Sequence, residues 1–251
     1  MNGLLWGLLG GGVSGLATTL GAIPILLRNK KISSFLKNIN MDFVTGVMLS
    51  AAAFALIWPA YEKVVNREDK NVELILVSLA LFSGVLFIST VGKLIEHLNR
   101  HNSNMKKNKK AMMFVIAMMV HNFPEGLASG AAMTIPETAQ GFSLLTAIAV
   151  QNVPEGLTTA LSFVTLGLNP LVAFIGAMGT GLVELMGGII GGYLSHRIDG
   201  VLPLLMAFAG GAMVSVTVVE IIERLKVESY RFFVGPSFLS GILIMILFNN
   251  L

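Results

Sequence analysis

Long apolar runs, separated by short polar and charged segments, make up most of the chain. Eight stretches carry almost no charge: 3–27, 43–61, 74–92, 111–135, 139–164, 170–194, 202–222 and 232–248. A helix that crosses a bilayer core needs about 20 apolar residues, with a working range of about 17–25. The runs are continuous rather than alternating, which argues against a spanning β-barrel. The pattern predicts an all-α integral membrane protein with eight transmembrane helices.

Composition supports the same class. Hydrophobic residues make up 54% of the 251 residues and charged residues only 12%, against about 25% charged residues in soluble domains. The chain has no cysteine, which excludes disulfides and thiolate metal sites. The eight runs leave no room for a separate soluble domain, so residues 1–251 are predicted to form a single transmembrane domain.

Basic residues predict the orientation. All 17 Lys and Arg lie outside the eight runs, and alternate loops divide them thirteen to four. Cytoplasmic loops carry the excess of Lys and Arg, so both termini are predicted to be extracytoplasmic and the protein to lie in the inner (plasma) membrane among its lipids. The polar, Lys-rich segment 94–110 is then a cytoplasmic loop. The basic charge is thereby explained by topology, and no nucleic-acid partner is expected.

Four acidic residues interrupt the apolar runs without any basic residue beside them: Glu125, Glu155, Glu184 and Glu220. A charged side chain at the centre of a bilayer costs at least about 2.5–3.5 kcal/mol. Internal salt bridges to Lys or Arg cannot offset that cost. The acids are therefore either protonated and hydrogen-bonded between helices, or they meet a cation from solution, and the second interpretation is favoured.

The neighbours of two of these acids repeat. Residues 121–127 read HNFPEGL and residues 151–157 read QNVPEGL. In each copy the first residue and the glutamate are four apart and so share a helix face. Each proline lacks an N–H, which frees the carbonyl of Val120 or Val150. Two such helices can present imidazole, amide and carboxylate groups at one level, a set of nitrogen and oxygen ligands that suits a divalent transition metal.

At these motifs the chain resembles the ZIP (Zrt-, Irt-like) family of divalent metal transporters, prokaryotic type. The resemblance covers essentially the whole chain. It implies a 3+2+3 arrangement with helices 4 and 5 central, and a two-metal site between helices 2, 4, 5 and 6. It also implies import of the metal into the cytoplasm by an elevator-like movement.

The resemblance implies metal ligands at matching positions. In the second helix, residues 46–51 read GVMLSA and resemble bacterial members in which a methionine thioether reaches the metal. The ligands implied in this way are His121, Asn122, Glu125, Glu155, Glu184 and Met48. For the histidine and the amides, hydrogen bonding between helices remains the alternative, and for the methionine, simple core packing.

The chain also departs from the family pattern. Gln151 stands where many members have histidine and Asn152 where some have aspartate, so the second subsite has less negative charge; both remain candidate ligands. Glu220, with Glu223, could form an exit or regulatory metal site, or only an interfacial pair. His97 and His101 are candidates for metal capture in the cytoplasmic loop.

The sequence therefore predicts a divalent metal importer that is not an enzyme and has no resident cofactor. Zinc is the expected metal, with cadmium, iron, manganese and cobalt as alternatives. A membrane metalloenzyme is disfavoured because the HExxH motif of metalloproteases is absent, and a metal sensor without flux is a further alternative. Homodimerisation is also considered, because the glycines at 187, 188, 191 and 192 allow close helix contacts within or between chains.

Overall fold

The computed structural model describes residues 2–27, 41–65, 67, 70–100, 107–135, 138–227 and 235–249. Every regular element in these residues is helical, which confirms the all-α prediction. The helices are α1 (Gly3–Ala22), α3 (Met41–Ser50), α4 (Trp58–Val65), α5 (Lys70–Arg100), α6 (Lys107–Ala132), α7 (Thr138–Thr165), α8 (Pro170–Arg197), α9 (Val201–Val227) and α10 (Pro236–Asn249). A short 3₁₀ helix, η1 (Ile23–Leu26), extends α1.

Each predicted apolar run contains a helix, but one predicted loop is shorter than expected. The sequence predicts a loop over segment 94–110, whereas α5 continues to Arg100 and α6 begins at Lys107. The backbone hydrogen bonds of a helix do not require apolar side chains. Hydropathy therefore marks the apolar part of these helices and not their ends.

Five helical segments in the described part of the chain are long and apolar enough to cross a membrane: Gly3–Leu26, Asp42–Val65, Lys70–Ile95, Pro170–Arg197 and Val201–Val219. A shorter apolar helix covers Pro236–Leu247. A multi-pass membrane protein is thus supported, and the count of eight crossings stays a prediction.

The second apolar run is one continuous helix with a change of hydrogen-bonding pattern in its middle. Between α3 and α4, residues Ala51–Ile57 form a π-helix, η2, and the N–H of Trp58 donates to the carbonyl of Ala53, five residues back. Such segments are rare and occur mostly as single turns, frequently at functional sites. Nothing in the sequence predicts this change of hydrogen-bonding pattern.

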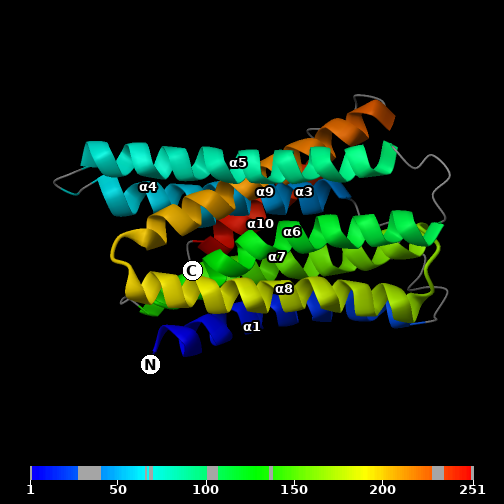
Figure 1. Ribbon diagram of the computed structural model, residues 1–251, viewed down its shortest axis with the longest axis horizontal. Coiled ribbons are helices and arrows are strands. Elements are labelled where there is room, and N and C mark those ends of the chain that lie inside the picture. The colour runs from blue at the N-terminus through cyan, green and yellow to red at the C-terminus, as the bar shows by residue number, and fades with distance from the viewer. Residues whose placement is uncertain are drawn as a thin grey trace.

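The helices run side by side along the long axis of the molecule (Figure 1), with α5, α4 and α3 on one side, α1 and α8 on the other, and α6 and α7 between them. Helix α1 packs on α8 and α7, and α5 packs on α9. Helices α6 and α7 contact members of both sides: α6 meets α8 and α5, while α7 meets α1 and η2, the segment that joins α3 to α4. This arrangement puts the two motif helices inside the bundle. The 3+2+3 grouping itself remains a prediction.

Glycines bring α1, α6 and α8 into backbone contact. A Cβ on Gly15 would lie 2.2 Å from the carbonyl oxygen of Gly181, and one on Gly191 would lie 2.1 Å from that of Leu127. Small residues at such positions let membrane helices approach closely. The glycines at 187, 188, 191 and 192 therefore make contacts within this chain, to α1 or α6, and homodimerisation stays untested.

Candidate metal centre

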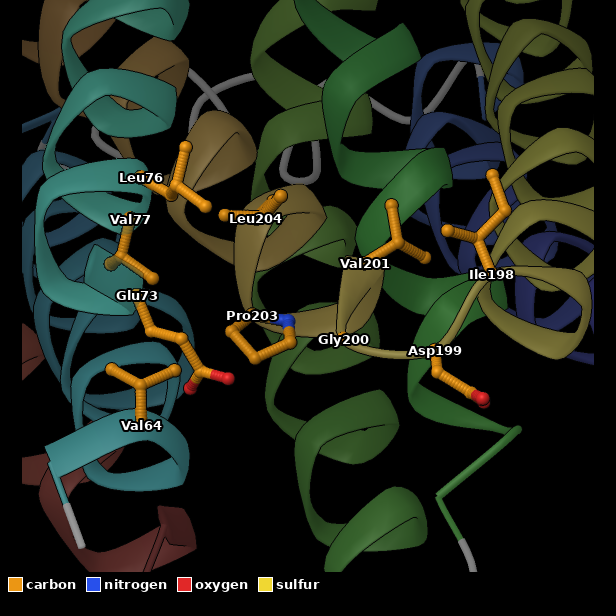
Figure 2. A pocket seen from close by; sticks show the side chains of 10 residues that line it. All are labelled: Val64, Glu73, Leu76, Val77, Ile198, Asp199, Gly200, Val201, Pro203 and Leu204. Carbon is orange, nitrogen blue, oxygen red and sulfur yellow. The ribbon is translucent and has the colours of Figure 1, made fainter. Parts of the chain in front are cut away.

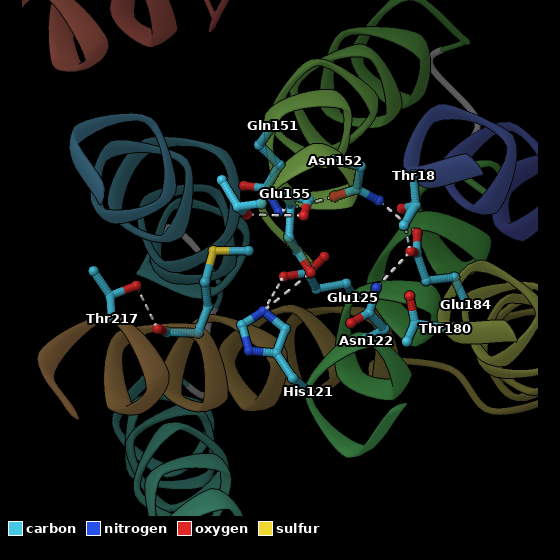
Figure 3. A network of polar contacts seen from close by, with 12 residues as sticks. Thr18, His121, Asn122, Glu125, Gln151, Asn152, Glu155, Thr180, Glu184 and Thr217 are labelled. Carbon is cyan, nitrogen blue, oxygen red and sulfur yellow. Dashed lines mark hydrogen bonds and ion pairs between the residues drawn. The ribbon is translucent and has the colours of Figure 1, made fainter. Parts of the chain in front are cut away.

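The two repeated motifs lie inside α6 and α7, each around an internal proline, Pro124 or Pro154. Their acidic side chains are enclosed by the bundle: Glu125 is 1% exposed and Glu155 is 2% exposed. Glu184 of α8 is fully buried beside them. Figure 3 shows these side chains pointing toward one another from three helices. The predicted convergence of the motifs is therefore present in the structure.

A histidine and two carboxylates form the first part of this centre. The Nε2 atom of His121 lies 3.1 Å from Oε1 of Glu125 and 3.5 Å from Oε1 of Glu155. One ligand atom from each of the three residues can be chosen so that all lie within 4.8 Å of one another. One imidazole and two carboxylates at these separations could surround a single divalent ion.

Several buried polar atoms of the two motifs have no hydrogen-bond partner among the described residues. They are His121 Nδ1, Asn122 Oδ1, Glu125 Oε2, Gln151 Oε1, and both Oε1 and Oε2 of Glu155. Leaving a buried polar group without a partner costs about 1–3 kcal/mol. Oxygen and imidazole nitrogen atoms can all donate an electron pair to a cation. A cation bound among them would satisfy atoms that the protein leaves unpaired.

The second part of the centre is a hydrogen-bonded carboxylate. Oε1 of Glu184 accepts hydrogen bonds from Thr18 Oγ1 at 2.5 Å and Asn122 Nδ2 at 2.7 Å. Oε2 accepts from Asn152 Nδ2 at 2.5 Å and from the hydroxyl of Ser14. The amide of Asn152 also donates to Ser14 Oγ at 2.8 Å. Four helices, α1, α6, α7 and α8, thus meet at one carboxylate.

Sequence reasoning missed the two hydroxyl residues of α1. Ser14 and Thr18 are four residues apart, so they share one face of the helix, and neither is exposed. That spacing was the available signal. It is a weak one, because serine and threonine in helices commonly bond to their own backbone, as Thr19 does to the carbonyl of Gly15 at 2.8 Å.

The remaining candidates belong to other helices, or their side chains lie outside the described residues. Met48 is buried in α3 at 4% exposure, and its role as a ligand stays a prediction. Glu220 and Glu223 belong to α9, but their side chains lie outside the described residues. His97 is exposed near the end of α5, and His101 lies outside the described residues.

A separate pocket of about 210 Å³ opens between the start of α5 and the turn from α8 to α9. Figure 2 shows Glu73 on one wall and Asp199 near the other, among mainly apolar side chains. One carboxylate oxygen of Glu73 is paired with Arg67 at 2.9 Å. The residues that line this pocket include none of the candidate ligands.

Comparison with known proteins decides the family. The profile of the family described as ZIP zinc transporter matches residues 102–249. Zinc transporter GufA of Myxococcus xanthus is 34% identical over 230 residues, which cover 90% of this chain and 89% of GufA. This chain belongs to the ZIP zinc transporter family. It is therefore a transporter rather than an enzyme.

Other ZIP relatives agree along nearly the full length. Zinc transporter ZIPB of Bordetella bronchiseptica is 28% identical over 258 residues, covering 98% of this chain and 81% of ZIPB. Zinc transporter ZupT of Chlorobium chlorochromatii is 26% identical over 249 residues, covering 92% of each chain. The resemblance drawn from the two motifs is thus confirmed, and the metalloenzyme alternative is wrong.

Proposed function

We propose that this chain transports zinc or another divalent transition metal across the membrane, and that the ion binds among His121, Glu125 and Glu155. The observation that carries the proposal is the set of unpaired, buried electron-pair donors on α6 and α7. The curated relatives GufA, ZIPB and ZupT, all named zinc transporters, support the choice of zinc. Cadmium, iron, manganese and cobalt remain alternatives.

The donor set suits a transported ion. The two carboxylates balance the charge of a dication, and the imidazole adds a nitrogen ligand of the kind that zinc commonly takes. The amide oxygens of Asn122 and Gln151, which lack partners, are neutral donors that help replace water without adding charge. Conduction requires binding strong enough to enter and weak enough to leave, and a mixture of charged and neutral ligands meets both needs.

The direction and topology belong to the same proposal. The ion moves into the cytoplasm through one transmembrane domain of eight helices with both termini outside, as the thirteen-to-four division of basic residues supports. The family resemblance also implies a second metal position that Asn152 lines and that shares Glu125 and Glu155 with the first, with Glu184 among the implied ligands of the centre. The observations support the first position more strongly, because Glu184 already accepts four hydrogen bonds.

Zinc uptake into proteoliposomes tests the transport proposal. Liposomes that contain the purified protein and an enclosed zinc-sensitive dye should brighten after zinc is added outside. Glu125→Ala and Glu155→Ala should each abolish most of this flux while the protein remains folded, because each removes a ligand that has no Lys or Arg partner. Glu62→Ala, which removes an exposed acid on α4, is the matched control.

Two outcomes would contradict the proposal. Near-normal uptake by either site variant would show that the ion does not pass between α6 and α7. Zinc bound to the wild-type protein without any flux would instead favour a metal sensor. Circular dichroism and gel filtration of each variant would separate a lost ligand from a lost fold.

A further inference from the structure

We propose that Glu184 is a hydrogen-bonded anchor rather than a metal ligand, so that the centre holds one metal ion and not two. Ser14, Thr18 and Asn152 act as positioning residues through this carboxylate, and Asn122 is bound to it through the nitrogen of its amide. The inference rests on the proposed function, since it concerns the position beside the proposed zinc site.

The first argument is the number of hydrogen bonds that the carboxylate of Glu184 can accept. An ionised carboxylate has two oxygens and about four lone-pair sites. In Glu184 each oxygen accepts two hydrogen bonds, one from a hydroxyl of α1 and one from an asparagine amide. A metal ion could bind this side chain only by displacing donors that are themselves fully buried.

The second argument is the contrast between three carboxylates of one centre. Three of the four carboxylate oxygens of Glu125 and Glu155 have no hydrogen bond among the described residues, whereas both oxygens of Glu184 are fully engaged. The unpaired oxygens of Glu125 and Glu155 lack a compensating partner, and a bound cation would supply it. The paired atoms already have their compensation from neutral donors, which carry partial positive charge on hydrogen.

The third argument is the orientation of the two asparagines. Asn122 and Asn152 occupy the same place in the two repeated motifs, and each points its amide N–H group at Glu184 (Figure 3). A second metal would need their oxygens on that side, because an amide nitrogen that carries hydrogens donates and does not accept. The amide pair therefore closes the second position to a cation.

The hydrogen bonds to Glu184 also affect the proposed zinc site formed by His121, Glu125 and Glu155. His121 immediately precedes Asn122, so fixing one side chain restrains the helix segment that carries the other. The same carboxylate fixes Asn152, three residues before Glu155. Outer partners that orient metal ligands typically change metal affinity by about 10–100-fold when they are removed. Ser14 and Thr18 are thus expected to tune zinc binding without touching the ion.

A count of bound zinc tests the inference. The purified full-length protein in detergent is dialysed against zinc, and the bound zinc is counted in the wild-type protein and in the Glu155→Ala variant. One equivalent lost on Glu155→Ala supports a single-ion centre. Glu184→Gln should retain that equivalent. A loss of two equivalents on Glu155→Ala, or of one on Glu184→Gln, would overturn the inference while leaving the transport proposal intact.

A gain-of-metal variant gives an independent reading. Asn152→Asp removes an amide donor and places a second carboxylate against Glu184, so it should add one zinc equivalent. An unchanged count would contradict the explanation based on the amide. If this variant does not fold, the number of zinc ions bound by the wild-type protein still tests the single-ion centre. If Glu155→Ala binds as much zinc as the wild type, both the proposed metal position and the inference are refuted.

The positioning role needs its own readout. Thr18→Val keeps the shape of the side chain and removes one donor, and should weaken zinc binding by about tenfold with the count still at one. Thr18→Ser restores the hydroxyl and should restore the affinity. Thr180→Val is the matched control, because Thr180 is equally buried on α8 but donates only to the carbonyl of Ala177. Equal affinity in Thr18→Val and Thr180→Val would overturn the positioning role.

Discussion

The glycine that follows the glutamate of the first motif offers a sharp test of the packing around the metal centre. In Gly126→Ala the new Cβ would lie 2.2 Å from the carbonyl oxygen of Glu184 and 2.7 Å from its Cα. Both of these atoms are backbone, so no side chain can turn aside. Helices α6 and α8 would have to separate by roughly 1 Å to reach van der Waals contact.

The size of the effect follows from that separation. Asn122 lies one turn before Gly126, and its hydrogen bond to Glu184 is 2.7 Å long. A shift of roughly 1 Å takes it beyond the useful range, whose upper limit is about 3.2 Å. Overpacking costs about 1–3 kcal/mol, and a lost hydrogen bond to a charged group costs about 1.5–3 kcal/mol. The expected destabilisation is therefore roughly 2.5–6 kcal/mol, a large part of the stability of a typical domain.

A control variant whose expected change in stability has the opposite sign makes this prediction more stringent. In Gly12→Ala the Cβ would meet only the end of Leu185 at 4.0 Å, and alanine in a helix is favoured over glycine by about 0.5–1 kcal/mol. Thermal unfolding in detergent should show Gly126→Ala melting well below the wild type and Gly12→Ala at or above it, with zinc uptake lost only in the first. Equal melting temperatures for the two variants would refute the close contact between α6 and α8.

Three further substitutions test other features. Met48→Leu keeps the volume of a buried side chain, so folding should change little, while a greater loss of cadmium than of zinc affinity would be expected if the soft thioether is a ligand. Pro154→Ala restores an N–H that can bond to the carbonyl of Val150, and it should lower zinc uptake by straightening α7, whereas unchanged uptake would show that the proline does not position Glu155. Arg67→Ala breaks an exposed ion pair with Glu73 and should change the free energy of unfolding by less than about 1 kcal/mol, as measured by thermal or denaturant unfolding.

The positions of the helices could be predicted from the sequence because burial in lipid requires apolar residues in long runs. Helix ends could not, since α5 continues through polar residues to Arg100 where the hydropathy signal has already ended. The π-helical change in the second run was also invisible, because a run of alanine, phenylalanine, leucine and isoleucine is compatible with either hydrogen-bonding pattern. The grouping of the helices in the bundle depends on which helix faces pack together, and the amino-acid composition does not determine this.

The core of the candidate site was predictable for a local reason. His121 and Glu125 are four residues apart, and the repeat brings Glu155 to the same level on the next helix. The hydrogen bonds from Ser14 and Thr18 were not predictable, since they join residues 170 and 166 positions away from Glu184. No local period marks such a pairing, and only the packing of α1 on α8 reveals it.

The π-helical turn of the second membrane helix makes this span tolerant of the loss of one residue. Each i→i+5 hydrogen bond encloses one residue more than an α-helical bond, so the segment behaves as an α-helix with one residue inserted. Deleting a single alanine there would let the segment close into an α-helix, so that Ala60 and Val64 stay in the interior and Trp58 and Tyr61 stay exposed. In an uninterrupted α-helix the same deletion would turn everything that follows by about 100°. A relative with one residue fewer in this stretch would present the same neighbours at the aligned positions, so a one-residue gap there would leave the packing surface of the helix unchanged.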